Sequence, residues 1–168
     1  MKKLPIGVSN FEEMIKGNYY YVDKTLLIKE IIDLSGEVKL ITRPRRFGKT
    51  LNMDMIRRFF LVKEKENLFE EFAIWKEKGL VKEHYHRYPV VMISFKEIKD
   101  VSWKSASNHL VVILSNLVME YLGLETDESS KRILRKLAER EATLEEYVDV
   151  LRFLTEILYK VTGKKRLS

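Results

Sequence analysis

Gly48, Lys49 and Thr50 are the residues whose types and order best fit a defined chemistry, and the basic segment Arg43–Phe47 directly precedes them. The same three residue types end the phosphate-binding pattern G-x-x-x-x-G-K-[ST]. In that pattern the loop N–H groups and the N-terminus of the next helix face the phosphates, the lysine reaches the β- and γ-phosphates, and the hydroxyl binds Mg²⁺. We therefore expect Gly48 to let the backbone approach a phosphate closely, Lys49 to bind the phosphate and Thr50 to hold Mg²⁺.

The segment departs from the pattern at its first position, where Arg43 replaces the first glycine. A Gly-Lys-Thr tripeptide alone is a weak signal, because such a tripeptide occurs by chance in many proteins. Its surroundings strengthen it, since a short predicted strand, Val38–Thr42, leads into the segment and a predicted amphipathic helix begins at Lys49. The residues alone also allow a second interpretation, a helix start with a basic turn before it.

The elements around this segment predict an α/β domain. The helix that begins at Lys49 should bury one face, because its apolar residues recur at spacings of three and four. The run Tyr88–Phe95 predicts a strand covered on both faces, as in a parallel sheet. Further helices are predicted over residues 9–16, 23–32, 103–122 and 127–140, and from the capping box of Thr143 and Glu146 through Leu158. Strand, turn and helix followed by strand and helix indicate the α/β class.

Composition places the chain among globular proteins. Its 168 residues are 45% hydrophobic, which is sufficient for one domain with a core. It has no cysteine, so disulfides and thiolate metal sites are excluded and a reducing, cytoplasmic setting is expected. No apolar run reaches the roughly 18 residues of a membrane span, so we expect no membrane partner. The net charge of +6 weakly favours polyanions such as nucleotides or nucleic acid.

Three segments together resemble the predicted AAA-ATPase-like family of P-loop proteins. They are Leu4–Gly7, Tyr20–Thr25 and Thr42–Asn52, and the pair YVDKT and RPRRFGKT within them is quite specific. The family's own phosphate loop, its Walker A element, carries arginine in place of the first glycine, so we expect Arg43 to be structural. The resemblance implies ATP and Mg²⁺ as cofactors and ATPase-like activity. It also implies a nuclease-like domain of the PD-(D/E)XK type after this domain in many members.

The resemblance also implies which residues form the nucleotide site. They are Arg45, Arg46, Phe47, Gly48, Lys49, Thr50 and Leu51 at the loop, with Thr50 as the metal ligand, and Tyr21 and Asp23 near the adenine. The segment of Tyr21 and Asp23 has an alternative interpretation, a helix cap beside a core tyrosine. Arg45 and Arg46 also have two interpretations: their side chains reach phosphate oxygens, or they only face solvent.

The end of the sequence differs from the family. Family members continue after Gly163-Lys164-Lys165 into an apolar strand that closes on Asp-Glu, the Walker B element, whereas this sequence stops at Ser168. Asp100 is expected to be a loop residue and no substitute for that pair. The expected fold is therefore a helix-rich, partial P-loop NTPase of the AAA/ASCE type, a three-layer α/β/α domain that lacks the Walker B strand, with residues 1–168 as the N-terminal portion of a single domain.

Such a truncated chain should bind ATP without hydrolysing it, because phosphoryl transfer relies on Mg²⁺ placement and a positioned water. Its predicted strands would have exposed edges, so marginal stability is expected. Its partner would be a missing C-terminal half or a nuclease-like domain.

Two other functions remain open. One is a basic module for nucleic acid or protein partners, formed by Arg43, Arg45, Arg46, Lys164, Lys165 and Arg166. Nucleic acid bound there should be released steeply by salt and be insensitive to Lys49→Ala. The other is a truncated remnant without function.

Overall fold

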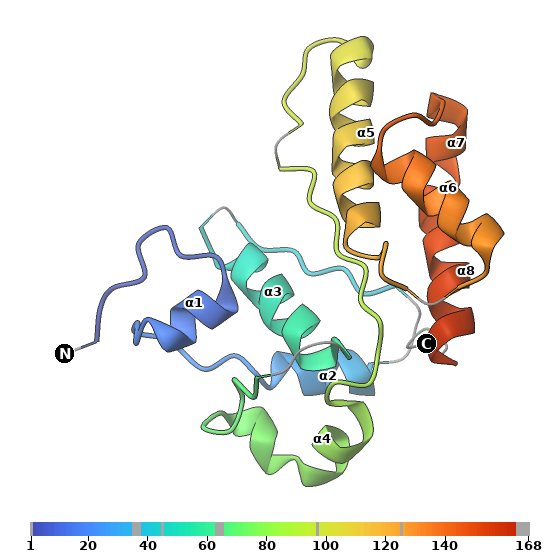
Figure 1. The fold of residues 1–168 in the computed structure, drawn as a ribbon. Coiled ribbons are helices and arrows are strands. Elements are labelled where there is room, and N and C mark those ends of the chain that lie inside the picture. Colours follow the sequence, from blue (N-terminus) through green and yellow to red (C-terminus); the bar gives the residue numbers. More distant parts are fainter. Residues whose placement is uncertain are drawn as a thin grey trace. The chain divides into compact units, whose positions relative to one another are not determined.

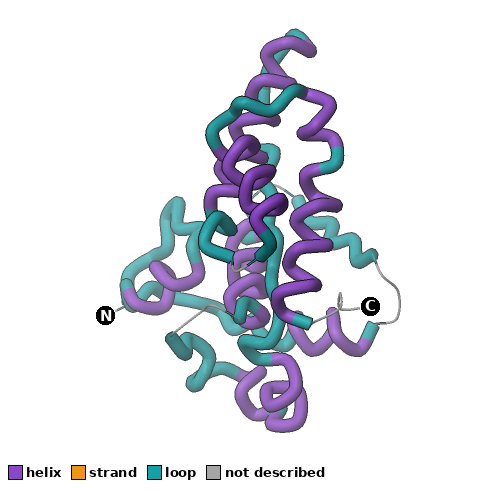
Figure 2. Tube along the Cα trace, turned by 45° about the vertical axis from the view of Figure 1, so that its right-hand side comes forward, coloured by secondary structure: helices purple, strands orange, loops and turns teal. Residues whose placement is uncertain are grey.

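The computed structural model describes residues 2–34, 38–44, 46–62, 66–96, 98–124 and 126–163. Helices provide nearly all the regular secondary structure of these residues (Figure 1, Figure 2). The described residues up to Val90 form one compact unit, and those from Val91 form a second. Each unit has its own cluster of buried apolar side chains.

The first unit packs its helices around an aromatic core. Its elements are α1 (Phe11–Lys16), α2 (Leu27–Asp33), α3 (Lys49–Phe60), the 3₁₀ helix η1 (Ala73–Lys76) and α4 (Lys78–His84). In the core, the rings of Phe11 and Phe69 stack with centroids 5.2 Å apart, and Phe59 meets Phe69 edge-on at 5.4 Å. Such aromatic pairs add stability beyond the area that they bury. The core therefore fixes α3, because Phe59 lies on this helix.

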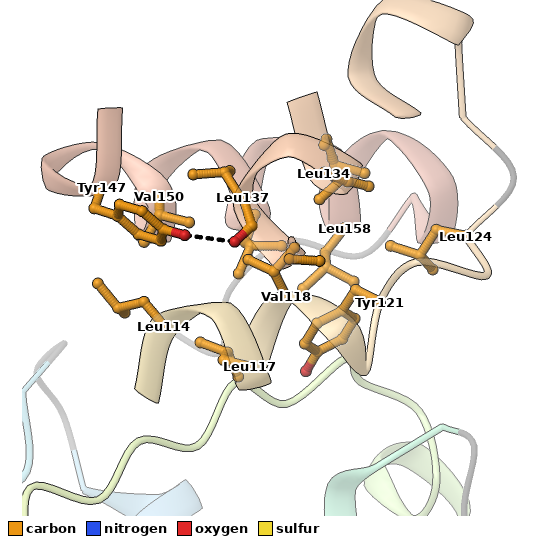
Figure 3. Packing of buried hydrophobic residues seen from close by; sticks show 13 residues of the cluster. Leu114, Leu117, Val118, Tyr121, Leu124, Leu134, Leu137, Tyr147, Val150 and Leu158 are labelled. Atoms are coloured by element: carbon orange, nitrogen blue, oxygen red, sulfur yellow. Dashed lines mark hydrogen bonds between the residues drawn. The ribbon is translucent and has the colours of Figure 1, made fainter. Parts of the chain in front are cut away.

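The second unit is a small helical assembly. Its elements are α5 (Trp103–Met119), α6 (Glu128–Ala138), α7 (Leu144–Val148) and α8 (Val150–Thr162). Figure 3 shows Leu114, Leu117, Val118 and Tyr121 of α5 and the turn after it among the leucines and valines of α6 and α8. The buried Tyr147 hydroxyl donates to the carbonyl of Leu137 at 2.5 Å (Figure 3). It also lies 2.7 Å from the buried Ser115 hydroxyl, so one side chain joins α5, α6 and α7.

Side-chain caps explain where several helices begin. Asn10, Ser102 and Asp127 each accept a hydrogen bond from the N–H three residues later, at 2.9, 3.2 and 2.9 Å. These bonds satisfy N–H groups that have no partner inside the helix. The predicted capping box is confirmed, since the Thr143 N–H donates to Glu146 at 2.7 Å and the Glu146 N–H donates to the Thr143 hydroxyl at 3.4 Å.

Two predicted helices have different limits in the structure. The helix predicted from Thr143 through Leu158 is divided at Asp149, whose φ of −94° and ψ of 2° separate α7 from α8. The helix predicted from residue 23 begins only at Leu27. The Asp23 carboxylate instead accepts from the N–H and hydroxyl of Thr25, so it caps a turn that precedes α2.

The expected three-layer α/β/α P-loop domain is wrong for the part of the chain that the structure describes. Neither 38–42 nor 88–95 forms a strand there, and strand pairing among the described residues is limited to single parallel bridges, Lys3 with Tyr19 and Leu61 with Tyr88. The physical reason is that β-prone residues become a strand only where neighbouring strands accept their backbone hydrogen bonds.

The apolar run 88–95 has another role in the structure. The Tyr88 N–H donates to the carbonyl of Phe60 and its carbonyl accepts from Val62, each at 2.9 Å, so the run begins tied to the end of α3. Val90 packs against the core of the first unit, whereas Val91 and Ile93 pack against that of the second. Burial against helices therefore explains the apolar residues that predicted a sheet strand.

Candidate functional site

A turn with two left-handed residues leads into α3. Gly48 is the N-terminal cap of the helix with φ 71° and ψ 21°, and Arg46 has φ 69°. Glycine adopts this conformation freely, whereas a residue with a Cβ pays about 1–2 kcal/mol. Nothing lies within 4 Å of a Cβ placed on Gly48, so its backbone angle, and not lack of space, favours glycine here.

The side chain of Lys49 folds back over the turn. Its ammonium group donates to the carbonyl of Arg43 at 2.5 Å and to the carbonyl of Pro44 at 2.9 Å. The bonds span six and five residues, so Lys49 closes the loop between the segment 38–44 and α3. An ammonium group has three donors, and the third can serve an anion next to the loop.

The N-terminus of α3 is suited to an anion. Lys49, Thr50 and Leu51 are its first residues, and their N–H groups have no acceptor within the helix, as at the start of any α-helix. The first turn carries no acidic residue, so no carboxylate neutralises the positive end of the helix dipole. Thr50 and Phe47 are exposed, whereas Leu51 packs partly against the core of the first unit.

Asp23 and Thr25 join the segment before α2 to the residues around η1. The Asp23 carboxylate accepts from the Thr25 N–H at 2.8 Å, the Thr25 hydroxyl at 2.7 Å and the Ala73 N–H at 2.8 Å. The buried Thr25 hydroxyl accepts in turn from the Ile74 N–H at 3.1 Å. Burial opposes ionisation, but the bonds from Ala73 and Thr25, with Lys76 nearby, hold the pKa of Asp23 below its ordinary value. The carboxylate thus serves as a cap within the first unit.

Tyr21 belongs to the core of the same unit. Its ring meets Phe11 and Phe72 edge-on, with centroids 5.5 and 5.4 Å apart. Its hydroxyl lies 3.3 Å from the sulfur of Met55 on α3, and burial raises the pKa of Tyr21 to about 12. Met55 follows Thr50 by five residues, about 7–8 Å along a helix. The arrangement has the features of the core-tyrosine alternative, and a role of Tyr21 and Asp23 near a base stays a prediction.

A buried ionic group that sequence reasoning missed holds α3 against α1. The Asp54 carboxylate accepts from the Phe11 N–H at 2.7 Å and from Arg58 at 3.1 Å, and Arg58 also pairs with Glu12 at 2.9 Å. The spacing of Asp54 and Arg58 by four residues was a signal of a helical ion pair. The bond to Phe11 had no signal, because 43 positions separate the two residues. This group positions the helix whose first residues carry the candidate site.

Some expected site residues lie outside the described residues. Arg45 is one, and so are Lys164, Lys165 and Arg166 of the expected basic surface. Arg43 and Arg46 are described and exposed. Asp100 lies in a loop as expected, where it accepts from Ser105 at 2.5 Å and contacts His109 at 2.6 Å. The described part of the chain contains no group of three or more acidic, histidine or cysteine side chains suited to a metal ion. None of its helices is long and apolar enough to cross a membrane.

Comparisons with known proteins place the chain in a family. A protein of Azotobacter chroococcum mcd 1, described as "Uncharacterized protein in vnfD 5'region", is 38% identical to it over 95 residues. The matched region is 56% of this chain and 17% of the relative, so the chain spans less than a fifth of that curated relative's length. No solved structure matches the chain. A family model described as "Predicted AAA-ATPase" matches residues 5–164, nearly the whole sequence, and the chain therefore belongs to this family.

Proposed function

We propose that the chain binds the phosphates of ATP, carried with Mg²⁺, at residues 43–51. The observation that carries the proposal is the position of the Lys49 ammonium, held on the loop carbonyls of Arg43 and Pro44 beside the left-handed Gly48. It occurs in a member of the Predicted AAA-ATPase family, for which ATP binding is the general expectation. The proposal depends on the turn and on α3, not on a sheet.

Three kinds of donor meet at the start of α3 in this proposal. The N–H groups of Lys49, Thr50 and Leu51 point out of the helix end, where the dipole favours negative charge. The Lys49 ammonium supplies its third donor, or exchanges one loop carbonyl for a phosphate oxygen. Arg43 and Arg46, both exposed, add positive charge beside them. Charge-assisted bonds of this kind are about twice as strong as neutral ones.

The residues present fit a Mg²⁺ ion that arrives with the nucleotide. Mg²⁺ keeps several waters and is usually held by substrate phosphates with one or two protein oxygens. The exposed hydroxyl of Thr50 is the protein oxygen that this position of the loop would supply. Asp54, one turn further along α3, is already bonded to Phe11 and Arg58. Bound Mg²⁺ would neutralise phosphate charge.

We further propose that the chain of 168 residues binds ATP without turning it over. Hydrolysis needs a group that orients the attacking water, in addition to phosphate contacts. The Asp54 carboxylate, on the same helix as Thr50, does not supply this group, because it is buried and bonded to the Phe11 N–H and to Arg58. Phosphate release should therefore stay at the level of a blank.

The test is a titration of the chain with a fluorescent ATP analogue and Mg²⁺. Lys49→Ala should weaken binding at least about ten-fold, as expected for the loss of a charged contact. Lys104→Ala is the matched control, because Lys104 is an exposed lysine at the start of α5. It should bind like the wild type. Phosphate release is followed in the same samples.

Other outcomes separate the alternatives. Absence of binding by a demonstrably folded wild-type chain would contradict the proposal and favour a remnant without function. Nucleic acid binding that falls steeply with salt, and that Lys49→Ala leaves intact, would favour the basic interaction surface instead.

A further inference from the structure

A hollow in the first unit lies beside the loop. One of its walls is formed by α2 and the residue after it, through Leu27, Glu30, Ile31 and Leu34, and the other by the run Val38–Arg43. Apart from Arg43, its lining residues have no part in the phosphate contacts proposed above.

The hollow is continuous with the proposed phosphate site. Arg43 is the last residue of the run that lines the hollow. The carbonyl of the same residue accepts from the Lys49 ammonium at 2.5 Å. A molecule with its anionic end at Lys49 would therefore have its other end next to the lining of the hollow. This continuity restricts the occupant to one that combines a phosphate group with a less polar part.

The lining suits a flat, largely apolar ring with a hydrogen-bond donor at its edge. Its half-buried apolar side chains are those of Leu27, Ile31 and Ile41, with the half-buried Lys39 beside them, whereas Leu34, Val38 and Leu40 are exposed. Ligand sites commonly combine such a lining with a few polar groups that fix orientation. Glu30 is the acidic group of the lining, and its carboxylate makes no hydrogen bond or ion pair within the described part of the chain. A carboxylate accepts hydrogen bonds and donates none.

We infer that this hollow receives the nucleobase of the nucleotide, with an exocyclic amino group of the base donating to Glu30. The inference rests on the proposed function, since the phosphates must lie at residues 43–51. It assigns the base to a different place from Tyr21 and Asp23. The polar atoms of those two residues already bond to Met55, Thr25 and Ala73 inside the unit.

Calorimetric titration of the 168-residue chain with ATP and with inorganic tripolyphosphate, both with Mg²⁺, tests the inference. Leu34→Ala and Glu30→Ala should each weaken ATP binding about three- to ten-fold, the effect of losing one apolar or one hydrogen-bonding contact. Both variants should bind tripolyphosphate like the wild type, because tripolyphosphate has no base. Leu26→Ala and Asp33→Ala are the matched controls, since these exposed residues flank or belong to α2 but do not line the hollow. Both should leave the two affinities unchanged.

The outcomes separate this inference from the proposed function. If Lys49→Ala abolishes binding of both ligands while Leu34→Ala and Glu30→Ala change neither, the phosphate site stands and the base site is overturned. If the two variants weaken tripolyphosphate as much as ATP, their effect is on the fold and the base site is also overturned. If the folded wild type binds neither ligand, both the phosphate site and the base site are overturned.

Discussion

At the scale of single residues, Gly48 and Arg46 show how the turn before α3 depends on backbone conformation. Both residues lie in the left-handed region, with φ of 71° and 69°. Glycine has no Cβ and enters this region at no steric cost, whereas arginine enters it at a cost of about 1–2 kcal/mol. The loop therefore already carries one strained residue, and we expect a second to be poorly tolerated.

Gly48→Ala should lower the free energy of unfolding by about 1 kcal/mol, because alanine resists the positive φ. Gly79→Ala is the matched control. Gly79 lies in α4, has no positive φ and has open space around its Cβ position. Alanine is the better helix former, so this control should not lose stability. Urea unfolding of the three proteins gives the values, and equal losses for both variants would contradict a special conformation at Gly48.

The hydrogen bonds to the Asp23 carboxylate lead to a prediction about how the free energy of unfolding depends on pH. Partial desolvation of the carboxylate raises the pKa of Asp23, but the hydrogen bonds that Ala73 and Thr25 donate hold its folded-state pKa below the ordinary value of 3.8. A lowered folded pKa means that the unfolded chain binds the proton more readily. The resulting stability is complete above pH about 5 and is lost as the pH falls through the folded pKa.

Asp23→Asn should therefore lose stability at pH 7 and show a smaller decline between pH 5 and pH 3 than the wild type. Asp33→Asn is the control, since Asp33 is an exposed carboxylate at the end of α2. Asp33→Asn should lose stability between pH 5 and pH 3 as the wild type does. Thermal unfolding across this pH range measures both variants. If Asp23→Asn lost as much stability between pH 5 and pH 3 as the wild type, carboxylates other than Asp23 would be the cause of the decline.

Local sequence was sufficient to predict some structural features around the candidate site and not others. The order Gly48, Lys49, Thr50 predicted a turn leading into a helix, and α3 begins at Lys49. Each of those features depends on residues a few positions apart. The bond from the Phe11 N–H to Asp54 depends on two segments 43 positions apart. Their meeting is a result of tertiary packing, which a local pattern does not specify.

At the scale of elements, most helices were predicted correctly, whereas the predicted sheet is absent from the residues that the structure describes. A helix satisfies its own backbone, so a cap such as Asn10 or Thr143 with an apolar period is enough to indicate it. A strand needs a partner for every N–H and C=O. The runs 38–42 and 88–95 have β-prone residues, but the described residues give them no partner ladder. The apolar character of 88–95 is explained by its packing on two helical cores.

The hydrogen bonds of Tyr147 lead to a prediction about how α7 is held to α5 and α6. Its hydroxyl donates to the Leu137 carbonyl on α6 and pairs with the Ser115 hydroxyl on α5, and all three positions are inside the second unit. Tyr147→Phe leaves the buried Ser115 hydroxyl without this partner, whereas the Leu137 carbonyl still accepts from the Arg140 N–H at 3.3 Å, so it should cost about 1–3 kcal/mol. Tyr159→Phe removes a hydroxyl from a half-exposed ring on α8 and is the control. Chemical unfolding measures both, and equal small effects would show that the buried bonds contribute little.

At the scale of the whole molecule, two features bear on stability. The apolar core is divided into two clusters of buried residues, one in each unit. Each cluster contains only part of the buried apolar residues, and a small core leaves little net stability. Several large apolar side chains are also exposed, among them Val38 at 89% and Leu40 at 85%. Both features agree in direction with the marginal stability expected from the sequence, which stays a prediction until unfolding is measured.

The division into two cores leads to a prediction about local unfolding. The same small truncation is available in each core, since Ile28 is buried in the first unit and Ile157 in the second. An isoleucine-to-valine change in a core costs about 0.5–1.5 kcal/mol. If each core holds its own unit, Ile28→Val should reduce hydrogen-exchange protection in α1 and α3 by about two- to ten-fold, with little effect on α5 and α8.

Ile157→Val should have the opposite distribution, with faster exchange in α5 and α8 and little change in α1 and α3. The exposed Ile6 supplies a third Ile→Val change as a control that should alter neither unit. Peptide-level exchange measured by mass spectrometry resolves these segments. Equal loss of protection in both units from either core variant would show instead that the two cores unfold together as one cooperative structure. In that case a defect in the second unit, at Ile157, would lower the population of the folded phosphate site as strongly as one at Ile28.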